Sequence, residues 1–331
     1  MASGSVRDVR DLDVVGIGNA LVDVISHHDD GFLMSEALVK GSMTLIEADR
    51  ALSLYRSMGA GVHLSGGSAA NTMTGVASFG GRAAYIGKVA ADDLGDVFRH
   101  DLRAVGVTYE NQPGDPATPT GRCLIVVTPD AQRTMNTFLG VSSLLVPDDV
   151  DERLVARADV VYLEGYLFDR DGAKEAYRKA SAAAHAAGGK VSLTLSDSFC
   201  VDRHRDDFRD LVAGQVDLLF CNQEELVALY EASTVDEALD AVRHDCEVAA
   251  VTRGKEGSVV VTPDGVVPVA AHPVDEVVDT TGAGDLYAAG FLYGLTHGRS
   301  LADCGRLGSI AAAEVIAHVG ARPNVPLRRL V

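Results

Sequence analysis

The sequence predicts an α/β protein built on a mostly parallel sheet that is sandwiched between helices. Short apolar runs typical of buried strands, such as 13–17, alternate with helical segments, such as 69–79 and 173–187, along most of the 331 residues. Glycine pairs follow these two helical segments, at 80–81 and 188–189, and glycine there is typical of a helix end. Repeated strand–helix units with continuous apolar strands indicate a parallel sheet that is covered on both faces.

Two regions depart from this alternation. Residues 120–127 and 132–139 are strand-like runs joined by a short Thr-Pro-Asp-Ala turn, which indicates a hairpin. The strand-like runs within 20–48 likewise have no long helix between them. We therefore expect one domain over residues 1–331, with a small β-sheet lid formed by about 20–48 and 112–140. Small flaps of this kind often close over active sites, although an extension of the main sheet would leave the same pattern.

The composition argues against several classes of function. The formal net charge of −18 opposes non-specific attraction to nucleic acid and to anionic membranes. The five cysteines form no CxxC pair and the histidines form no HExxH motif, so neither a disulfide framework nor a zinc site is predicted. The N-terminus lacks the apolar core of a signal peptide, and no apolar run approaches the roughly 18 residues that span a membrane. We expect a cytoplasmic protein whose partners are small molecules.

The stretch 279–290, DTTGAGDLYAAG, is the most informative part of the chain. Gly282, Ala283 and Gly284 directly precede an expected helix, where small residues let successive N–H groups point into one concavity. Such a place holds a phosphate, and Asp285 beside it is suited to accept the proton of a hydroxyl that attacks a phosphoryl group. An ordinary helix start with aspartate near its cap would look the same. The chain has neither a P-loop nor a dinucleotide-binding fingerprint.

Two further stretches place polar groups near strand ends. Gly66 and Gly67, between a strand-like run and a helix, permit close approach of the backbone to a ligand, and Asn71 offers both donors and acceptors. Asp23 lies just beyond the first strand, where open α/β sheets bind ligands. Its carboxylate can accept from two neighbouring hydroxyls, as a sugar diol requires. Taken alone, each feature is more commonly an ordinary turn or a solvated loop.

Together, in this order and spacing, these stretches resemble the ribokinase/PfkB family of carbohydrate and nucleoside kinases. The similarity runs from about Gly16 to Pro323 and includes two signatures, GGSAANT with GRAAYIGKVAADDLGD and DTTGAGDLYAAG. The resemblance implies a ribokinase-like fold and an ATP-dependent kinase with an alcohol group as acceptor. It also implies ATP as co-substrate and Mg²⁺ as cofactor.

The resemblance assigns roles to residues at matching positions. The implied catalytic groups are the base Asp285, the anion hole of Gly282, Ala283 and Gly284, and Arg133 near the transferring phosphate. The implied substrate-binding residues are Asn19, Asp23, Gly66, Gly67, Ser68 and Asn71. The implied ATP-binding residues are Asn222, Glu225, Thr252, Arg253, Gly254 and Gly257. Glu225 would hold Mg²⁺ through water, and a monovalent cation such as K⁺ is implied near Asp279 and Thr281.

Within the family, GNALVD, PTGRC and LSDSF are similar to segments of the adenosine kinase branch. Ser198 replaces a proline of the animal enzymes, and Thr281 replaces an asparagine. Leu167 stands where those enzymes place an aromatic side chain against the base, and loss of such stacking weakens recognition by roughly 0.5–1.5 kcal/mol. Candidates for an apolar slot that holds a base are Leu21, Cys123, Phe138 and Leu167, which are equally compatible with a plain core.

The leading hypothesis is ATP-dependent phosphorylation of the 5′-hydroxyl of adenosine or a related nucleoside. The alternative keeps the chemistry but uses a free sugar, as ribokinases and fructokinases do. A binding protein that kept the fold and lost catalysis is disfavoured by the intact Asp285 motif, and an NAD-linked oxidoreductase by the missing third glycine. The sequence leaves the preferred acceptor and the oligomeric state open, and an exposed lid edge is compatible with a homodimer.

Overall fold

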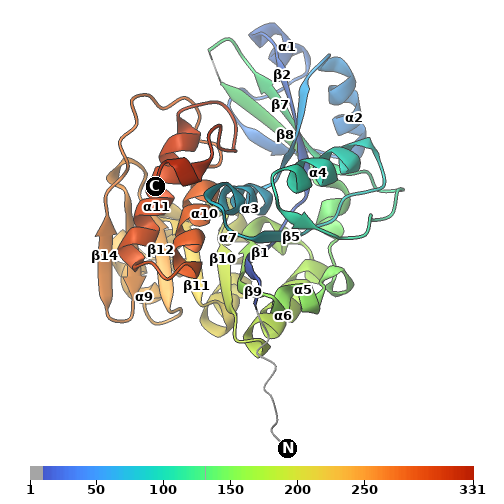
Figure 1. The fold of residues 1–331 in the computed structure, drawn as a ribbon. Coiled ribbons are helices and arrows are strands. Elements are labelled where there is room, and N and C mark those ends of the chain that lie inside the picture. The colour runs from blue at the N-terminus through green and yellow to red at the C-terminus, as the bar shows by residue number, and fades with distance from the viewer. Residues whose placement is uncertain (1–9, 131) are drawn as a thin grey trace, which may run out of the picture.

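The structure is a computed structural model that describes residues 10–130 and 132–331. In these residues a nine-stranded sheet forms the body and a five-stranded sheet stands over one end of it (Figure 1). The large sheet has the strand order β14-β13-β12-β11-β10-β9-β1-β5-β6, and the small sheet has the order β3-β8-β7-β2-β4. The predicted α/β fold, a mostly parallel sheet with a second small sheet, is confirmed.

Seven strands of the large sheet run parallel, from β12 to β6 in its spatial order. Their bounds are β1 Leu12–Ile17, β5 Ala83–Ile86, β6 Thr108–Tyr109, β9 Ala158–Glu164, β10 Lys190–Thr194, β11 Leu218–Asn222 and β12 Val248–Thr252. An antiparallel hairpin, β13 (Ser258–Thr262) and β14 (Gly265–Val269), completes one edge. The apolar strand interiors are buried on both faces, as expected for a parallel sheet between helices.

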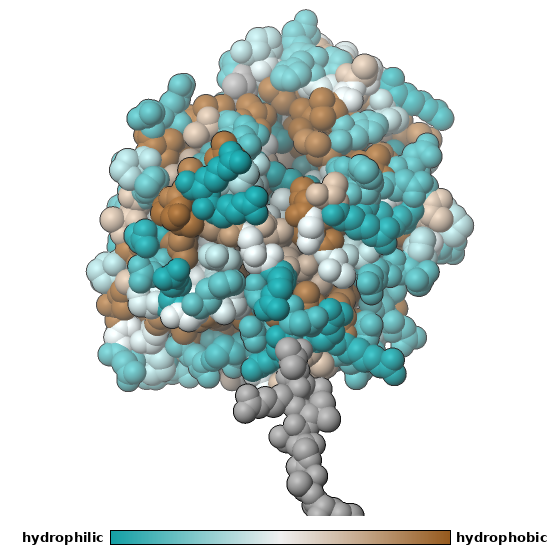
Figure 2. All heavy atoms as spheres, in the orientation of Figure 1, coloured by the Kyte–Doolittle hydropathy of each residue, from teal (hydrophilic) through white to brown (hydrophobic). Residues whose placement is uncertain are grey.

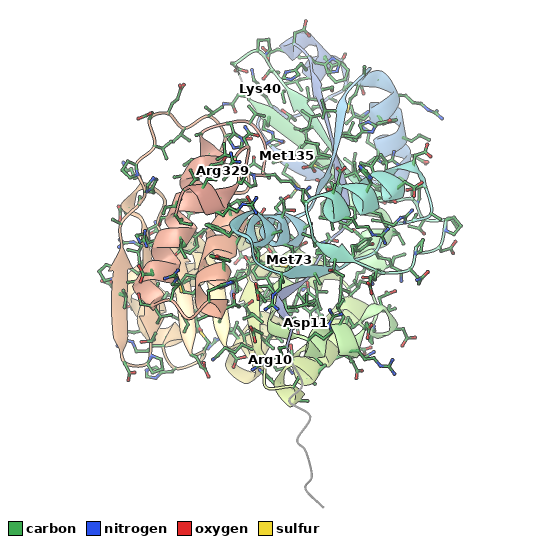
Figure 3. All side chains as sticks on the ribbon, in the orientation of Figure 1. Arg10, Asp11, Lys40, Met73, Met135 and Arg329 are labelled. Carbon is green, nitrogen blue, oxygen red and sulfur yellow. The ribbon has the colours of Figure 1, made fainter. Side chains whose placement is uncertain are left out.

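Helices cover both faces of the large sheet (Figure 1). The helices on one face are α3 Ser68–Phe79, α4 Asp93–Ala104, α10 Ala283–Thr296 and α11 Leu301–Ile316, and those on the other are α5 Glu152–Ala156, α6 Asp171–Ala186, α7 Ser198–Gln215, α8 Gln223–Tyr230 and α9 Val235–Val242. The side chains of neighbouring residues in β1 point to opposite faces of the sheet. Val14 packs against the first group of helices and Val15 packs against the second group. In Figure 3, Met73 marks α3 where it packs closely on this strand.

The small sheet contains β2 Leu21–His27, β3 Met43–Leu45, β4 Val62–Gly66, β7 Gly121–Val127 and β8 Arg133–Phe138, with α1 Asp30–Ser35 and α2 Ala48–Ser57 attached. Strands β7 and β8 pair antiparallel, as predicted for the hairpin, although Ala131 of its turn lies outside the described residues. Strand β4 pairs with β2 and therefore joins this sheet from outside the two expected insertions. Figure 2 shows a largely hydrophilic face on which hydrophobic surface gathers toward the top, over the small sheet.

All five cysteines of the chain are buried and free. Burial raises the pKa of the Cys123, Cys200 and Cys246 thiols to about 12 and that of Cys304 to about 11. Burial also raises the pKa of Cys221 well above its usual range. These thiols therefore stay protonated at neutral pH and pack as small apolar side chains.

The remaining elements are short turns of 3₁₀ helix, η1 Gly140–Leu144, η2 Pro147–Asp149, η3 Gly165–Asp169, η4 Gly254–Glu256 and η5 Leu327–Arg329. None of the helices in residues 10–130 and 132–331 is both long and apolar enough to cross a membrane.

Candidate active site

A cavity of about 990 Å³ lies between the two sheets. Its floor is formed by the carboxyl ends of β9, β10, β11 and β12 and by the first turns of α3, α7 and α10. Its roof is the small sheet, from which Met135 of β8 reaches the cavity; Figure 3 marks the place of this residue. Open α/β sheets bind ligands at the carboxyl ends of their strands, and this cavity occupies that position.

Asp285, in the first turn of α10, is held by two residues from the first turn of α3. Ser68 Oγ donates to Asp285 Oδ1 at 2.6 Å, and Asn71 Nδ2 donates to Asp285 Oδ2 at 3.0 Å. The two helices approach closely at Gly75, where a Cβ would lie 2.5 Å from Ala289 Cβ. Burial raises the pKa of Asp285, and the two hydrogen bonds oppose that rise. The result is a positioned carboxylate that is more basic than an exposed aspartate.

The start of α10 faces the same cavity with small residues. Gly282 adopts the left-handed conformation at φ 80° and directly precedes the first helical residue, Ala283. Gly282, Ala283 and Gly284 all line the cavity. Because the first N–H groups of a helix have no intrahelical partner, this turn offers donors and partial positive charge to an anion beside Asp285.

Asp23 lies on β2, in the roof of the cavity. Burial raises its pKa to about 6, the positive charges of Arg133 and Arg322 lower it, and the charge of Asp285 raises it. Gly66 of β4 leaves room for this carboxylate, since a Cβ there would lie 2.7 Å from Asp23 Oδ1 and Oδ2. Gly67 adopts φ 100°, and a Cβ there would clash with the backbone carbonyl of Asn19. Both positions therefore need glycine, because other atoms of the same chain approach them too closely for a side chain to fit.

Glu164, at the end of β9, is a site residue that the sequence interpretation missed. Its carboxylate accepts from Asn19 N at 3.1 Å, Asn19 Nδ2 at 2.9 Å and Ala69 N at 2.9 Å. The side chain is 1% exposed, and burial raises its pKa to about 7. It ties the loop after β1 to the start of α3. The available signal was an acidic residue that ends the apolar run ADVVYLEG.

Asn222 and Glu225 cap the start of α8 at the opposite end of the cavity. Asn222 N and Nδ2 donate to the Glu225 carboxylate at 3.0 and 2.7 Å, and Glu225 N donates to Asn222 Oδ1 at 2.8 Å. Burial raises the pKa of Glu225 to about 7. Thr252 and Gly254 also line this end, whereas Arg253 and Gly257 do not.

Arg253 and Gly257, which the resemblance implies in ATP binding, lie in the turn between β12 and β13, and their role in ATP binding stays a prediction. The Arg253 guanidinium forms an ion pair with Glu256 at 2.8 Å. Gly257 adopts φ 87° in the turn before β13, where a Cβ would clash with Val269 O. Both residues shape the turn between β12 and β13, and neither lines the cavity.

The apolar slot for a nucleobase stays a prediction, and its four candidate residues lie in different places. Leu21 and Cys123 line the cavity, but Phe138 and Leu167 do not. Side chains alternate along β8, so Met135 and Thr137 face the cavity while Phe138 faces away. Leu167 is 2% exposed and packs in the core on the other face of the large sheet. Apolar residues that sequence reasoning missed at the cavity include Met43, Leu45, Ile125, Met135 and Phe199.

Arg133 and Asp279 form a buried ion pair between the small sheet and the segment before α10. Asp279 also accepts from Thr281 N at 3.0 Å, Thr281 Oγ1 at 2.7 Å and Gly320 N at 2.9 Å. These donors and Arg133 occupy both oxygens of the Asp279 carboxylate, so the monovalent cation implied near Asp279 and Thr281 would be held by backbone oxygens, which stays a prediction. Arg133 already supplies the positive charge there.

Comparison with known proteins identifies the family. The model of the pfkB family carbohydrate kinases matches residues 42–328. The chain belongs to the pfkB family. It is therefore an ATP-dependent kinase that acts on a hydroxyl group, with ATP as co-substrate.

Two solved structures are similar to this pfkB kinase over nearly its whole length. Adenosine kinase from Sinorhizobium meliloti is 53% identical with a TM-score of 0.89, covering 96% of this chain and 98% of that one. A probable sugar kinase protein from Rhizobium etli is 50% identical with a TM-score of 0.89, covering 96% and 97%. Among curated proteins, adenosine kinase 1 of Arabidopsis thaliana is 27% identical over 334 residues, covering 93% of this chain and 94% of its own length.

Proposed function

We propose that this pfkB kinase phosphorylates the 5′-hydroxyl of adenosine or a closely related nucleoside. The observation that carries the proposal is one cavity that joins three features: the carboxylate of Asp285, the carboxylate of Asp23 and an apolar wall. A nucleoside has a reacting hydroxyl, a ribose diol and an apolar base, and each feature suits one of these groups. The similarity to the Sinorhizobium meliloti enzyme supports the same acceptor.

In this proposal the reaction uses Asp285 as base and Asp23 as the anchor of the ribose. Asp23 accepts hydrogen bonds from the 2′- and 3′-hydroxyls, which directs the 5′-hydroxyl toward Asp285. The 5′-oxygen forms a bond to the γ-phosphorus as the bond from that phosphorus to ADP breaks, and the 5′ proton passes to Asp285. The first turn of α10 binds the transferring phosphoryl group through its N–H groups.

The apolar wall favours a nucleoside over a free sugar. Met43 and Leu45 of β3 and Ile125 of β7 line the roof of the cavity, and Phe199 in the first turn of α7 lines it from the floor. Phe199 is 74% exposed, although it is a large aromatic side chain. A bound base would cover such surfaces, and burial of apolar area is favourable by about 25 cal/mol per Å². A free sugar has no group of this kind to offer.

The other end of the cavity suits the phosphates of ATP. Mg²⁺, when bound, neutralises charge on the β- and γ-phosphates. Glu225 fits a role through water, because both its oxygens already accept from Asn222 and Mg²⁺ commonly keeps several waters. Any K⁺ near 279–281 would be held by backbone oxygens, since Arg133, Thr281 and Gly320 occupy the Asp279 carboxylate.

The test is ADP release from ATP and Mg²⁺ with adenosine, inosine, guanosine, ribose or fructose as acceptor. We expect adenosine or another nucleoside to give the highest kcat/KM. Asp285→Asn should lower kcat by about 10²–10⁴-fold with little change in KM, because the base is lost and the binding contacts remain. Asp264→Asn, an exposed residue in the turn between β13 and β14, is the control and should keep full activity.

Turnover of free sugars alone would overturn the nucleoside proposal and favour the sugar kinase alternative, which the similarity to the Rhizobium etli protein supports. Full turnover by Asp285→Asn would overturn the role of the base.

A further inference from the structure

Arg322 lies in the segment that follows α11, directly after Ala321, which lines the cavity. This segment packs against α3, where Leu327 N donates to Ser78 Oγ at 2.9 Å. Arg322 Nε donates to Asn71 Oδ1 at 3.3 Å, and Arg322 Nη1 donates to Ser65 Oγ at 2.7 Å. Arg322 itself does not line the cavity, whereas its partner Asn71 does.

The contact with Asn71 is important because an amide side chain has two chemically different ends. Asn71 Oδ1 faces Arg322, and Asn71 Nδ2 faces Asp285. The two ends are nearly the same size, so packing alone distinguishes them poorly. Rotation of the amide by 180° would place its oxygen against the Asp285 carboxylate and its NH₂ group against the guanidinium. Both contacts would be repulsive, so Arg322 selects the orientation that donates to Asp285.

Arg322 is held firmly enough to do this. Ser65, its other partner, is fixed through its backbone, since Ser65 N donates to Asp101 Oδ2 at 2.9 Å. Arg322 Nη2 is buried and has no hydrogen-bond partner within residues 10–130 and 132–331. A guanidinium in this setting is a costly group to bury, and a purely structural position would be filled more favourably by an apolar side chain.

We propose that Arg322 is a positioning residue for phosphoryl transfer. It fixes the orientation of the Asn71 amide so that the NH₂ group of Asn71 donates a hydrogen bond to Asp285. A hydrogen bond donated to the ionised carboxylate favours the ionised form, so Arg322 extends base catalysis to lower pH. This inference rests on the proposed role of Asp285 as the base. It applies to whichever acceptor the enzyme uses.

Other ionisable groups also face Asp285 and contribute to the pH profile. They are Asp23 on β2, Tyr162 and Glu164 on β9 and Tyr166 in η3. Arg322 also lowers the pKa of Asp23 directly. The experiment must therefore distinguish the effect that Arg322 exerts on Asp285 through Asn71 from its electrostatic effect on Asp23.

The measurement is kcat/KM against pH from 5 to 9 for the wild type and for Arg322→Met, Asn71→Leu and the double variant. In Arg322→Met we expect the acid limb to move up by about 0.5 to 1 pH unit, because the carboxylate loses one oriented hydrogen bond. Activity should then fall about three- to tenfold on the acid limb and change little on the plateau. In the Asn71→Leu background, Arg322→Met should cause no further movement of the acid limb.

Arg306→Met is the matched control, because Arg306 forms an exposed ion pair with Asp303 on α11. Arg322→Ala provides a second test, in which added guanidinium ion should restore the wild-type acid limb. A loss of activity that is equal at every pH would overturn the proposal, and so would an acid-limb movement that persists in the Asn71→Leu background. Full activity of Asp285→Asn would instead overturn the proposed base, which keeps the two failures distinct.

Discussion

The two ends of the acceptor site are built in different ways. At the base end, Asp285, Ser68 and Asn71 are joined by hydrogen bonds between helices that pack in the core. At the roof, the small sheet contributes Asp23 and a wall of partly exposed apolar side chains. The base end is ordered before any ligand arrives, whereas the roof can gain apolar burial when a ligand fills it. In the proposed reaction the chemistry is thus preorganised by the large sheet and its helices, and selectivity comes from the apolar wall, to which the small sheet and Phe199 of α7 both contribute.

The largest expected effect comes from the junction of the two ends, at Gly67. Gly67→Ala should abolish most activity and lower the free energy of unfolding by about 1–3 kcal/mol or more, because the new methyl group clashes with Asn19 O at φ 100°. The measurements are kcat/KM and the midpoint of urea unfolding.

Gly59→Ala is the matched control for the backbone conformation. Gly59 also has a positive φ, 53°, but a Cβ there has no neighbour within 4 Å. It should therefore show only the cost of the left-handed backbone. Equal effects of the two substitutions would show that close approach at Gly67 is unimportant and would weaken the contrast between the two ends.

An intermediate effect is expected at the apolar wall. Phe199→Ala should raise KM for adenosine about 5- to 30-fold, because the adenine ring of the substrate loses an aromatic contact worth roughly 1–2 kcal/mol. Turnover at saturating adenosine should change little, since Asp285 and its partners are untouched. Val266→Ala, on β14 and away from the cavity, is the control. A fall in kcat without a change in KM would mean that the wall takes part in positioning the reacting groups.

The smallest effect is a dependence of stability on pH. Burial raises the pKa of Asp23 to about 6 and the pKa values of Glu164 and Glu225 to about 7. Each group binds its proton more tightly in the folded chain than in the unfolded chain. The stabilisation that this provides is complete below about pH 4 and is lost as the pH rises through about 6–7.

We therefore expect the urea midpoint of the ligand-free enzyme to fall between pH 5 and pH 8. Glu164→Gln should make the midpoint fall less, because the accompanying loss in the free energy of unfolding becomes smaller by an amount on the order of 1 kcal/mol or more. Glu47→Gln, at an exposed position before α2, should leave it unchanged. A slope that Glu164→Gln does not alter would mean that Glu164 is ionised in the folded state, and that its three N–H donors outweigh its burial.

The sequence predicted the parts of this molecule that depend on local pattern. The alternation of apolar strands and helices indicated the parallel sheet, and the Thr-Pro-Asp-Ala turn indicated the hairpin of β7 and β8. It missed β4 as a member of the small sheet, because pairing with β2 is a long-range choice that five residues do not encode.

The same distinction holds for the site. Asp285, Asn71 and Gly67 stand in dense motifs and do line the cavity. Glu164 and Arg322 stand outside such motifs, and Phe199 ends the family-like segment LSDSF but was not predicted at the cavity. Their importance comes from partners that are distant in the chain: Ala69 for Glu164, and Asn71 for Arg322. No local pattern carries that information.

The five buried thiols have a practical consequence for studying the small sheet. Alkylating reagents attack the thiolate, and each native cysteine is both enclosed and held protonated at neutral pH. A cysteine introduced at Val39, which is 70% exposed beside the small sheet, would therefore react with a fluorophore far faster than any native one. Movement of the small sheet could then be followed by fluorescence in the otherwise unaltered enzyme, without first building a cysteine-free variant.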